Sequence, residues 1–262
     1  MSSISEKVRK VFAGSIAEGW DTKGNLIHKM NGKDNRVYEK IREFGYNGMT
    51  LLDVGCATGR LLEKADSMFK NSSLKGIDFS ADMISYAKQK NFSNDNAIQF
   101  ICDDWLEYDF KDEIFDLIIF KFVLHHLQDN EMALKKAKSL LKPGGKLIIY
   151  TPGEKYLVEI FGKVKDAEDC LGRKRKDQII NLLQKIEINN ISIESCEFQI
   201  SMKSFSDFVE FLKRIGSYQR IMHYSNNNWN NQFMLSIQNK YIDGMWHTGE
   251  YFLIIYKNII QE

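Results

Sequence analysis

Several features that would assign the chain to a particular class of protein are missing. Its 36 basic and 35 acidic residues leave a formal net charge of +1, which argues against a chain built as a whole to bind a polyanion. No apolar run approaches the roughly 20 residues of a membrane-spanning helix. The N-terminal M-S-S-I-S-E-K-V-R-K lacks the apolar segment of a signal peptide. We therefore expect a cytoplasmic protein with no membrane partner, and a nucleic-acid partner is disfavoured.

Cysteine is scarce as well. The four cysteines, Cys56, Cys102, Cys170 and Cys196, are scattered and form no C-x-x-C pair. Neither a metal site nor a disulfide framework is expected, and free thiols fit the cytoplasm.

The chain has 262 residues, of which 44% are hydrophobic and 27% charged, and these values predict one large globular domain or a domain with an insertion.

The stretch Thr50 to Gly59, T-L-L-D-V-G-C-A-T-G, is the most informative part of the chain. Its first residues predict the end of a buried strand, and the residues after it predict a helix. Between the two, Gly55, Ala57 and Gly59 form a turn with little or no side chain, which lets a flat cofactor lie against the backbone. The spacing is not the G-x-G-x-x-G of a nicotinamide or flavin site, and the Gly-Lys-Ser/Thr of a P-loop is absent.

A second predicted strand, residues 74–78, ends in an acid. Asp78 lies 19 residues after Gly59. This is the usual place for a carboxylate that accepts hydrogen bonds from ribose hydroxyls. The alternative is an acid that only caps the next helix, for which Ser80 is the predicted N-cap.

Further strands are predicted at residues 98–102, 115–120 and 146–150. The fourth strand and its continuation read F-D-L-I-I followed by L-H-H-L. A helix predicted over residues 130–141 ends at L-K-P-G-G, because Pro143 cannot continue it and the glycines supply the turn.

Together these motifs resemble class I S-adenosylmethionine (SAM) dependent methyltransferases. The resemblance covers about residues 48–152 and rests on the first turn, on G-x-D-x-S-x-x-M around Asp78, on the fourth-strand run and on L-K-P-G-G. It implies an α/β fold: a doubly wound, Rossmann-like sheet of seven strands, the last antiparallel, with helices on both faces. It also implies SAM as cofactor.

The resemblance implies a set of cofactor-binding residues. The first turn would hold the methionine and ribose side of SAM, Asp78 the ribose hydroxyls, Met83 the adenine face and Asp104 the adenine amino group, with Asp103 as the competitor for that role. The full predicted set is Asp53, Gly55, Cys56, Ala57, Thr58, Gly59, Asp78, Phe79, Met83, Asp103, Asp104, Trp105 and Phe120.

The segments around this core predict the rest of the organisation. Residues 1–45 are expected to form an N-terminal helical cap, with helices over 4–20 and 37–44. Residues 46–202 would form the SAM-binding core, 203–248 a helical insertion before the last strand, and 249–262 that strand. The order of elements in the tail is similar to methyltransferases of the biotin pathway, which esterify malonyl-acyl carrier protein. The basic run Arg173 to Lys176 is interpreted as a solvated helix end, with a docking site as the alternative.

Candidate catalytic and acceptor residues follow from the chemistry. A carboxylate acceptor needs no base, whereas a hydroxyl or phenol benefits from a histidine. His125 and His126 follow the fourth strand, and sugar O-methyltransferases use a histidine there, so either is a candidate base; the alternative is packing or capping. Candidates for the acceptor pocket or lid are Trp20, His28, Tyr218, Tyr224 and Trp229, together with Arg220, His223, Trp246 and His247. Trp20 could equally be a packing anchor.

The predicted function is therefore methyl transfer from SAM to a small-molecule or carrier-bound acceptor, with oxygen favoured over nitrogen or carbon. Methylation of RNA or protein is one alternative, disfavoured by the charge balance and by F-K-F-V where an Asn-Pro-Pro-Tyr-like motif would stand. A protein that binds SAM without transferring the methyl group is the other alternative.

Overall fold

The computed structural model describes residues 12, 20–21, 35–92, 95–158, 173–202, 204–214, 218, 235, 238–239 and 246–258. In this part of the chain seven strands form one sheet in the order β3-β2-β1-β4-β5-β7-β6. The strands are β1 (Thr50–Val54), β2 (Ser73–Asp78), β3 (Ala97–Cys102), β4 (Phe115–Lys121), β5 (Leu141–Pro152), β6 (Ile191–Ser201) and β7 (Trp246–Lys257).

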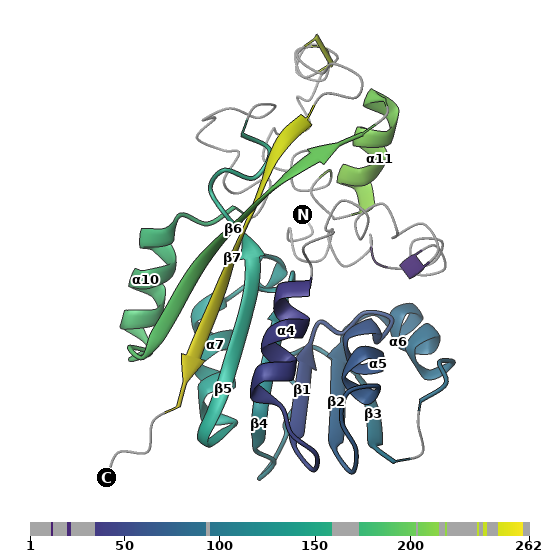
Figure 1. Ribbon diagram of the computed structural model, residues 1–262, viewed down its shortest axis with the longest axis vertical. Helices are drawn as coiled ribbons and strands as arrows, with labels where there is room; N and C mark the ends of the chain where they lie inside the picture. The colour runs from purple at the N-terminus through teal and green to yellow at the C-terminus, as the bar shows by residue number, and fades with distance from the viewer. Residues whose placement is uncertain are drawn as a thin grey trace.

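Strands β1 to β5 pair in parallel, whereas β7 is antiparallel to both β5 and β6. Figure 1 shows that β6 and β7 are long strands that extend beyond the parallel part of the sheet. The doubly wound sheet of seven strands with an antiparallel last strand is confirmed.

Helices cover both faces of the sheet. They are α4 (Asn35–Phe44), α5 (Arg60–Asp66), α6 (Ala81–Lys88), α7 (Asn130–Ser139), α10 (Lys176–Lys185), α11 (Phe205–Arg214) and the 3-10 helix η1 (Leu124–His126). Because side chains alternate along a strand, Leu51 packs with α4 and α5 on one face, and its neighbour Leu52 packs with α7 and α10 on the other. The same alternation decides which side chains at the carboxyl ends of the strands face the pocket described below.

Two local predictions need correction. In the predicted helix 4–20, Phe12 lies in a turn instead, whereas Trp20 is helical, as predicted, and so is Asp21, which follows it; the other residues of that prediction lie outside the described part. Strand β5 begins at Leu141 rather than after the glycines. The pairing with β4 shifts register between Phe115 and Leu117, which accommodates the extra residues around Pro143 within the strand.

The basic run Arg173 to Lys176 is only partly a solvated helix end. Lys176 begins α10, and Arg175 is its exposed N-cap. Arg173, by contrast, is buried, and its guanidinium donates to the carbonyl oxygens of Glu154 and Tyr156, each at 3.3 Å. The guanidinium therefore supports the chain segment that follows β5.

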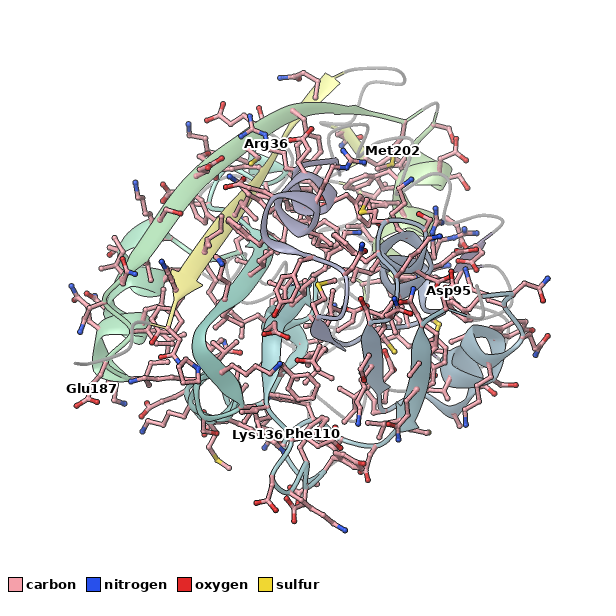
Figure 2. The ribbon with its side chains drawn as sticks, turned by 60° about the horizontal axis from the view of Figure 1, so that its bottom comes forward. Arg36, Asp95, Phe110, Lys136, Glu187 and Met202 are labelled. Atoms are coloured by element: carbon pink, nitrogen blue, oxygen red, sulfur yellow. The ribbon has the colours of Figure 1, made fainter. Side chains whose placement is uncertain are left out.

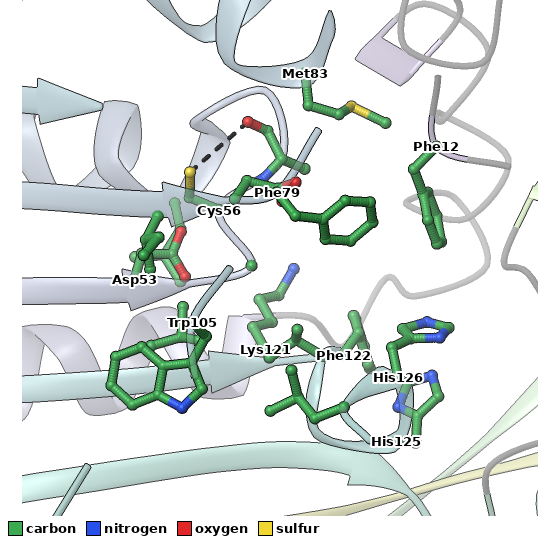
Figure 3. A pocket seen from close by; sticks show the side chains of 18 of the residues that line it. Phe12, Asp53, Cys56, Phe79, Met83, Trp105, Lys121, Phe122, His125 and His126 are labelled. Carbon is green, nitrogen blue, oxygen red and sulfur yellow. Dashed lines mark hydrogen bonds between the residues drawn. The ribbon is translucent and has the colours of Figure 1, made fainter. Parts of the chain in front are cut away.

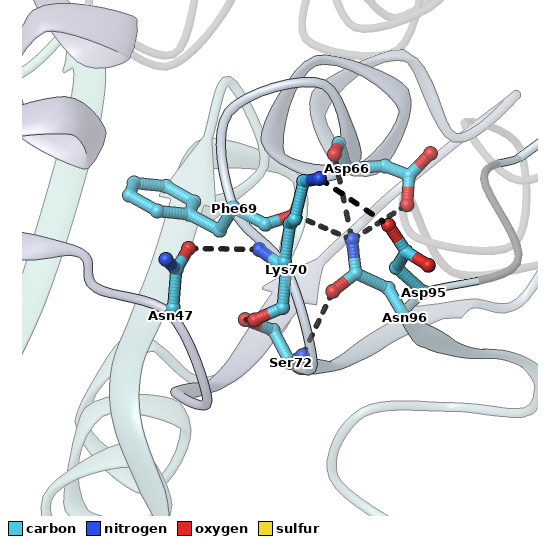
Figure 4. Close-up of polar contacts among 7 residues, drawn as sticks. All are labelled: Asn47, Asp66, Phe69, Lys70, Ser72, Asp95 and Asn96. Atoms are coloured by element: carbon cyan, nitrogen blue, oxygen red, sulfur yellow. Dashed lines mark hydrogen bonds and ion pairs between the residues drawn. The ribbon is translucent and has the colours of Figure 1, made fainter.

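At the amino edge of the sheet, Asn96 connects α5 to two strands (Figure 4). Its side-chain amide donates to Oδ1 of Asp66 at 2.7 Å and to the carbonyl oxygen of Phe69 at 2.8 Å, and its oxygen accepts from the backbone N–H of Ser72 at 2.8 Å. These bonds satisfy the buried amide and fix the end of α5, and they lie at the edge opposite to the candidate site.

Lys136 has a comparable role on α7. Its ammonium donates to the carbonyl oxygens of Trp105, at 2.7 Å, and of Tyr108, and it lies 5.6 Å from the centre of the Phe110 ring. Figure 2 shows Lys136 and Phe110 close together at one edge of the molecule. Burial lowers the pKa of Lys136. This one cation holds the turns that follow β3 against α7.

Candidate active site

A pocket opens at the carboxyl ends of the parallel strands, where ligands bind in open α/β sheets (Figure 3). Of the predicted cofactor-binding residues, those that line it are Asp53, Gly55, Cys56, Ala57, Thr58, Asp78, Phe79, Met83, Asp103, Asp104 and Trp105. Gly59 and Phe120 do not line it. Phe120 is fully buried and packs edge-on against the Trp105 ring, at 5.5 Å between ring centres.

The first turn has a backbone that requires its small residues. Gly55, Ala57 and Gly59 have φ angles of 71°, 46° and 76°, all in the left-handed region. A Cβ at Gly55 would lie 2.5 Å from a methyl group of Val123, and one at Gly59 would lie 2.8 Å from the Phe100 ring. The turn therefore presents bare backbone to the pocket at the start of α5.

Asp78 connects this turn to β2. Its Oδ2 accepts from the backbone N–H of Ala57 and its Oδ1 from that of Ser80, each at 2.9 Å. Burial raises the pKa of Asp78, and the two backbone donors act in the opposite direction. The predicted N-cap is confirmed, since Ser80 accepts from the backbone N–H of Met83 at 3.3 Å. The Asp78 carboxyl itself fixes the turn and also lines the pocket, and its role towards a ribose stays a prediction.

Asp53 is a second buried acid in the same wall, with 2% of its surface exposed. Burial raises its pKa to about 8, the nearby Lys121 opposes this shift, and Asp78 adds to it. At pH 7 the Asp53 carboxyl is therefore mostly protonated, and a cationic group placed beside it would favour its ionised form.

The turns after β3 contribute Asp103, Asp104 and Trp105. Asp104 Oδ1 accepts from the backbone N–H of Leu106 at 2.8 Å, and the Trp105 indole N–H donates to the carbonyl oxygen of Ala133 at 3.3 Å. Trp105 is thereby anchored to α7. Both acids line the same pocket wall, so the choice between them stays as the sequence leaves it.

The two histidines lie together on the 3-10 helix that follows β4. The ring centres of His125 and His126 are 4.0 Å apart, and both side chains line the pocket. Phe12 packs edge-on against His126, at 5.4 Å, and against Trp20, at 5.9 Å. The histidine pair and these two aromatic residues thus form one wall (Figure 3 draws all but Trp20).

Trp20 is the lid candidate that the structure brings to the pocket. Its neighbour Asp21 accepts from the Thr58 hydroxyl at 2.8 Å and pairs with Lys90 at 3.0 Å. Tyr218 packs partly buried against the core and does not line the pocket. His28, Arg220, His223, Tyr224 and Trp229 lie outside the described residues, as do the side chains of Trp246 and His247, whose backbone belongs to β7.

The sequence interpretation missed one half of the pocket. Lys121, the last residue of β4, reaches into it (Figure 3). A group of aromatic side chains also lines this half of the pocket. These are Tyr38, Phe122, Tyr156, Phe211 and Tyr251. They come from five separate parts of the chain, so no local motif unites them. The alternation of side chains along β4 could have indicated Lys121. It lies on the same face of the sheet as Ile119, which pairs with the pocket residue Asp53.

Comparisons with known proteins agree with this geometry. Residues 46–187, more than half of the chain, match the family described as Methyltransferase domain. The chain belongs to this family. Among curated relatives, the demethylmenaquinone methyltransferase of Staphylococcus aureus (strain JH9) is 29% identical over 223 residues, which cover 77% of this chain and 89% of the relative.

Solved structures share the fold of the methyltransferase. The plantazolicin methyltransferase BamL, in complex with a triazolic desmethylPZN analog and S-adenosylhomocysteine (SAH), gives a TM-score of 0.54 at 17% identity and covers 98% of this chain and 100% of its own. A phosphoethanolamine N-methyltransferase of Haemonchus contortus, also with SAH, gives 0.54 at 22% identity and covers 87% of this chain and 53% of its own.

The chain is thus a SAM-dependent methyltransferase. The residues of the pocket fit the cofactor: a left-handed turn exposes backbone, and buried carboxyls stand where hydroxyls and an ammonium group can donate. Within the described residues, no helix is long and apolar enough to cross a membrane.

Proposed function

We propose that this methyltransferase moves the methyl group of SAM to an oxygen atom of a small-molecule acceptor that enters beside His125 and His126. In this proposal the first turn and Asp53 hold the methionine and ribose side of the donor, Asp78 the ribose hydroxyls, and Asp104 the adenine. Gly59 and Phe120 support the site from behind, through the helix start and the packing of Trp105.

One observation carries the proposal. The pocket is continuous from the glycine turn, past Lys121, to the histidine pair and the aromatic side chains. Donor and acceptor can therefore lie side by side in one cavity, as an in-line displacement requires. The donor is already activated by its cationic sulfur, so the protein mainly has to position the two reactants and exclude water.

The histidine pair supplies the chemistry that favours oxygen. A neutral imidazole can take the proton of a hydroxyl or phenol as its oxygen attacks the methyl carbon, and a general base of this kind is worth roughly 10²–10⁴ in rate. A carboxylate acceptor, free or attached to a carrier, would need no such proton transfer.

The test combines binding with an acceptor screen. We expect calorimetric titration of the protein to show micromolar binding of SAM and SAH, followed by turnover with phenols, hydroxylated small molecules or carrier-bound acids. Binding of neither would contradict the donor site. Binding without turnover of any acceptor would favour the alternative of a SAM-binding protein that transfers no methyl group.

Variants of the histidines separate the acceptor types. If one of them is the base, His125→Gln or His126→Gln lowers kcat with a phenolic acceptor about 10²-fold or more and leaves the SAH affinity unchanged. With a carboxylate acceptor the same variant keeps its rate. Equal, small effects of both variants on every acceptor would assign the pair to packing.

A second candidate acceptor follows from the relatives. The S. aureus proteins are named for demethylmenaquinone, and the aromatic side chains of the pocket suit a flat ring. Demethylmenaquinone therefore belongs in the acceptor screen, and product analysis by mass spectrometry and NMR would show whether oxygen or carbon receives the methyl group.

A further inference from the structure

Lys121 stands at the junction of the two halves of the pocket. Strand β4 pairs with β1 so that Ile119 lies opposite Asp53, and Lys121 projects from the same face two residues further on. Its ammonium lies 5.0 Å from the centre of the Phe122 ring and 5.6 Å from that of Tyr38. Figure 3 shows the side chain rising into the cavity between Asp53 and Phe122.

The half of the pocket beyond Lys121 is apolar and aromatic. Phe122 packs against Tyr251 with ring centres 4.7 Å apart, and Tyr251 lies 5.5 Å from Tyr156. Burial raises the pKa of Tyr156, so this phenol stays neutral. Flat apolar molecules suit such a wall, since aromatic pairs gain more than area burial alone.

The backbone at this junction is strained. Phe122 has a φ of 58°, a left-handed conformation that is unfavourable for a residue with a Cβ. A hydrogen bond from its N–H to the carbonyl oxygen of Tyr150, at 2.9 Å, holds it there. Strain of this kind is found where a side chain must be aimed at a ligand. It turns the chain sharply after Lys121 and places the Phe122 ring beside the Lys121 ammonium.

The donor side and the aromatic side of the pocket differ in the acidic residues that they place around Lys121. The acidic residues that line the pocket, Asp53, Asp78, Asp103, Asp104 and Glu107, belong to the donor side. Burial raises the pKa of the Asp53 carboxyl, and Lys121 acts against this rise. Arg60, another basic lining residue, lies 3.9 Å from the Asp21 carboxylate. Among the described residues of the aromatic side, no carboxylate lines the pocket.

We propose that Lys121 is a specificity residue for the acceptor, and that the acceptor is a flat apolar molecule carrying an anionic oxygen: a phenolate, enolate or carboxylate. The inference rests on the proposed function, in which donor and acceptor share this pocket. The ammonium holds the negative oxygen at the boundary of the two halves while the aromatic side chains hold the body of the molecule. Lys121 thereby also favours the ionised form of a phenol or enol.

The step balances without a further reactant. A lone pair of the anionic oxygen forms the new bond to the methyl carbon, the electron pair of the C–S bond stays on sulfur, and the products are a neutral methyl ether or ester and SAH. When the acceptor enters as a neutral phenol, a histidine of the pair takes its proton. Lys121 transfers nothing and acts only by its charge.

The experiment uses a matched pair of probes on the full chain saturated with SAH. The probes are 2-naphthoate and its neutral isostere 2-naphthamide, and their affinities are measured by calorimetry. We expect the wild type to bind the anion about 10-fold or more tighter than the amide. Lys121→Met should abolish this preference, and Lys121→Arg should keep it. Lys64→Met, an exposed lysine of α5 that does not line the pocket, is the charge-matched control and should behave as the wild type.

The outcomes separate this inference from the function on which it rests. Failure of the wild type to bind SAH would contradict the proposed donor site. Normal SAH binding with equal affinities for the two probes, with no binding of either, or with a preference that survives in Lys121→Met would overturn the inference alone. A large loss of SAH affinity in Lys121→Met would also overturn it, because the lysine would then serve the carboxylate of the donor.

Discussion

The backbone N–H of Ala57 donates to Oδ2 of Asp78 at 2.9 Å, and this bond joins the glycine turn after β1 to the end of β2. The carboxyl that fixes the turn also lines the pocket. Because each carboxylate oxygen has a second lone pair, Asp78 can keep both backbone donors and still accept hydrogen bonds from a ligand. Shape and chemistry of the proposed donor site therefore depend on the same side chain.

Asp78→Ala should weaken SAM binding strongly. Two hydrogen bonds to a charged group, each worth roughly 1.5–3 kcal/mol, are at stake, so the dissociation constant should rise by about 10²-fold or more. Calorimetry with SAH measures this directly. Asp112→Ala, which removes an exposed carboxylate remote from the pocket, is the control. Unchanged affinity in Asp78→Ala would remove this residue from the donor site.

Ala57→Gly should stabilise the free protein. Ala57 has a φ of 46°, and a left-handed backbone costs a residue with a Cβ about 1–2 kcal/mol, part of which is offset because glycine is more flexible when unfolded. The expected gain is about 0.5–1 kcal/mol in the free energy of unfolding, measured by urea titration. The opposite sign is expected for Ala137→Gly inside α7. A loss of stability in Ala57→Gly would show that its methyl group packs favourably.

Asp53 gives the stability of the fold a pH dependence. The unfolded carboxyl ionises near pH 4, whereas in the folded protein its pKa is about 8. Between these values the folded state holds the extra proton, so the contribution is present at low pH and is lost as the pH rises towards 8. We expect the wild type to lose up to about 1.4 kcal/mol per pH unit between pH 5 and 7 relative to Asp53→Asn. Urea titrations at several pH values give both slopes, and parallel slopes would place the pKa of Asp53 in its ordinary range.

Local signals predicted most of the fold. The strand, glycine turn and helix from Thr50 onward, and the apolar run of β4, are encoded within a few residues, and the structure confirms them. The start of β5 could not be predicted in this way. Pro143 and the glycines indicate a turn locally, but pairing with β4 incorporates them into a bulged strand. Tertiary pairing here overrides the propensity of single residues.

The site shows a similar division. The half of the pocket proposed for the donor follows from motifs that are short in sequence. The half proposed for the acceptor gathers Tyr38, Phe211 and Tyr251 from distant elements. Phe120 and Lys121 show that, at the end of a strand, the side chain that faces the pocket depends on the exact residue position. Adjacent residues face opposite sides of a sheet, so a shift of one residue exchanges a core aromatic for a charged group in the pocket.

Lys136 links the stability of the fold to the proposed donor site. Its ammonium donates to the carbonyl oxygens of Trp105 and Leu106, at 2.7 and 3.3 Å, and so holds the turns that carry Asp104. Lys136→Met should leave these partly buried carbonyls unsatisfied and cost roughly 1.5–3 kcal/mol in the free energy of unfolding. It should also weaken SAH binding, because Asp104 and Trp105 lose their support.

The neighbouring Lys135 provides the matched control for this prediction. It is exposed and pairs with Glu131 one turn earlier on α7, at 2.8 Å. Such a pair is worth about 0.3–0.5 kcal/mol, so Lys135→Met should change stability little and SAH affinity not at all. If Lys136→Met unfolds at the same urea concentration as Lys135→Met, the carbonyl contacts contribute no net stability. If it is destabilised but binds SAH normally, the turns after β3 keep their shape without the lysine, and the proposed adenine site is held by the Trp105 indole bond to Ala133 instead.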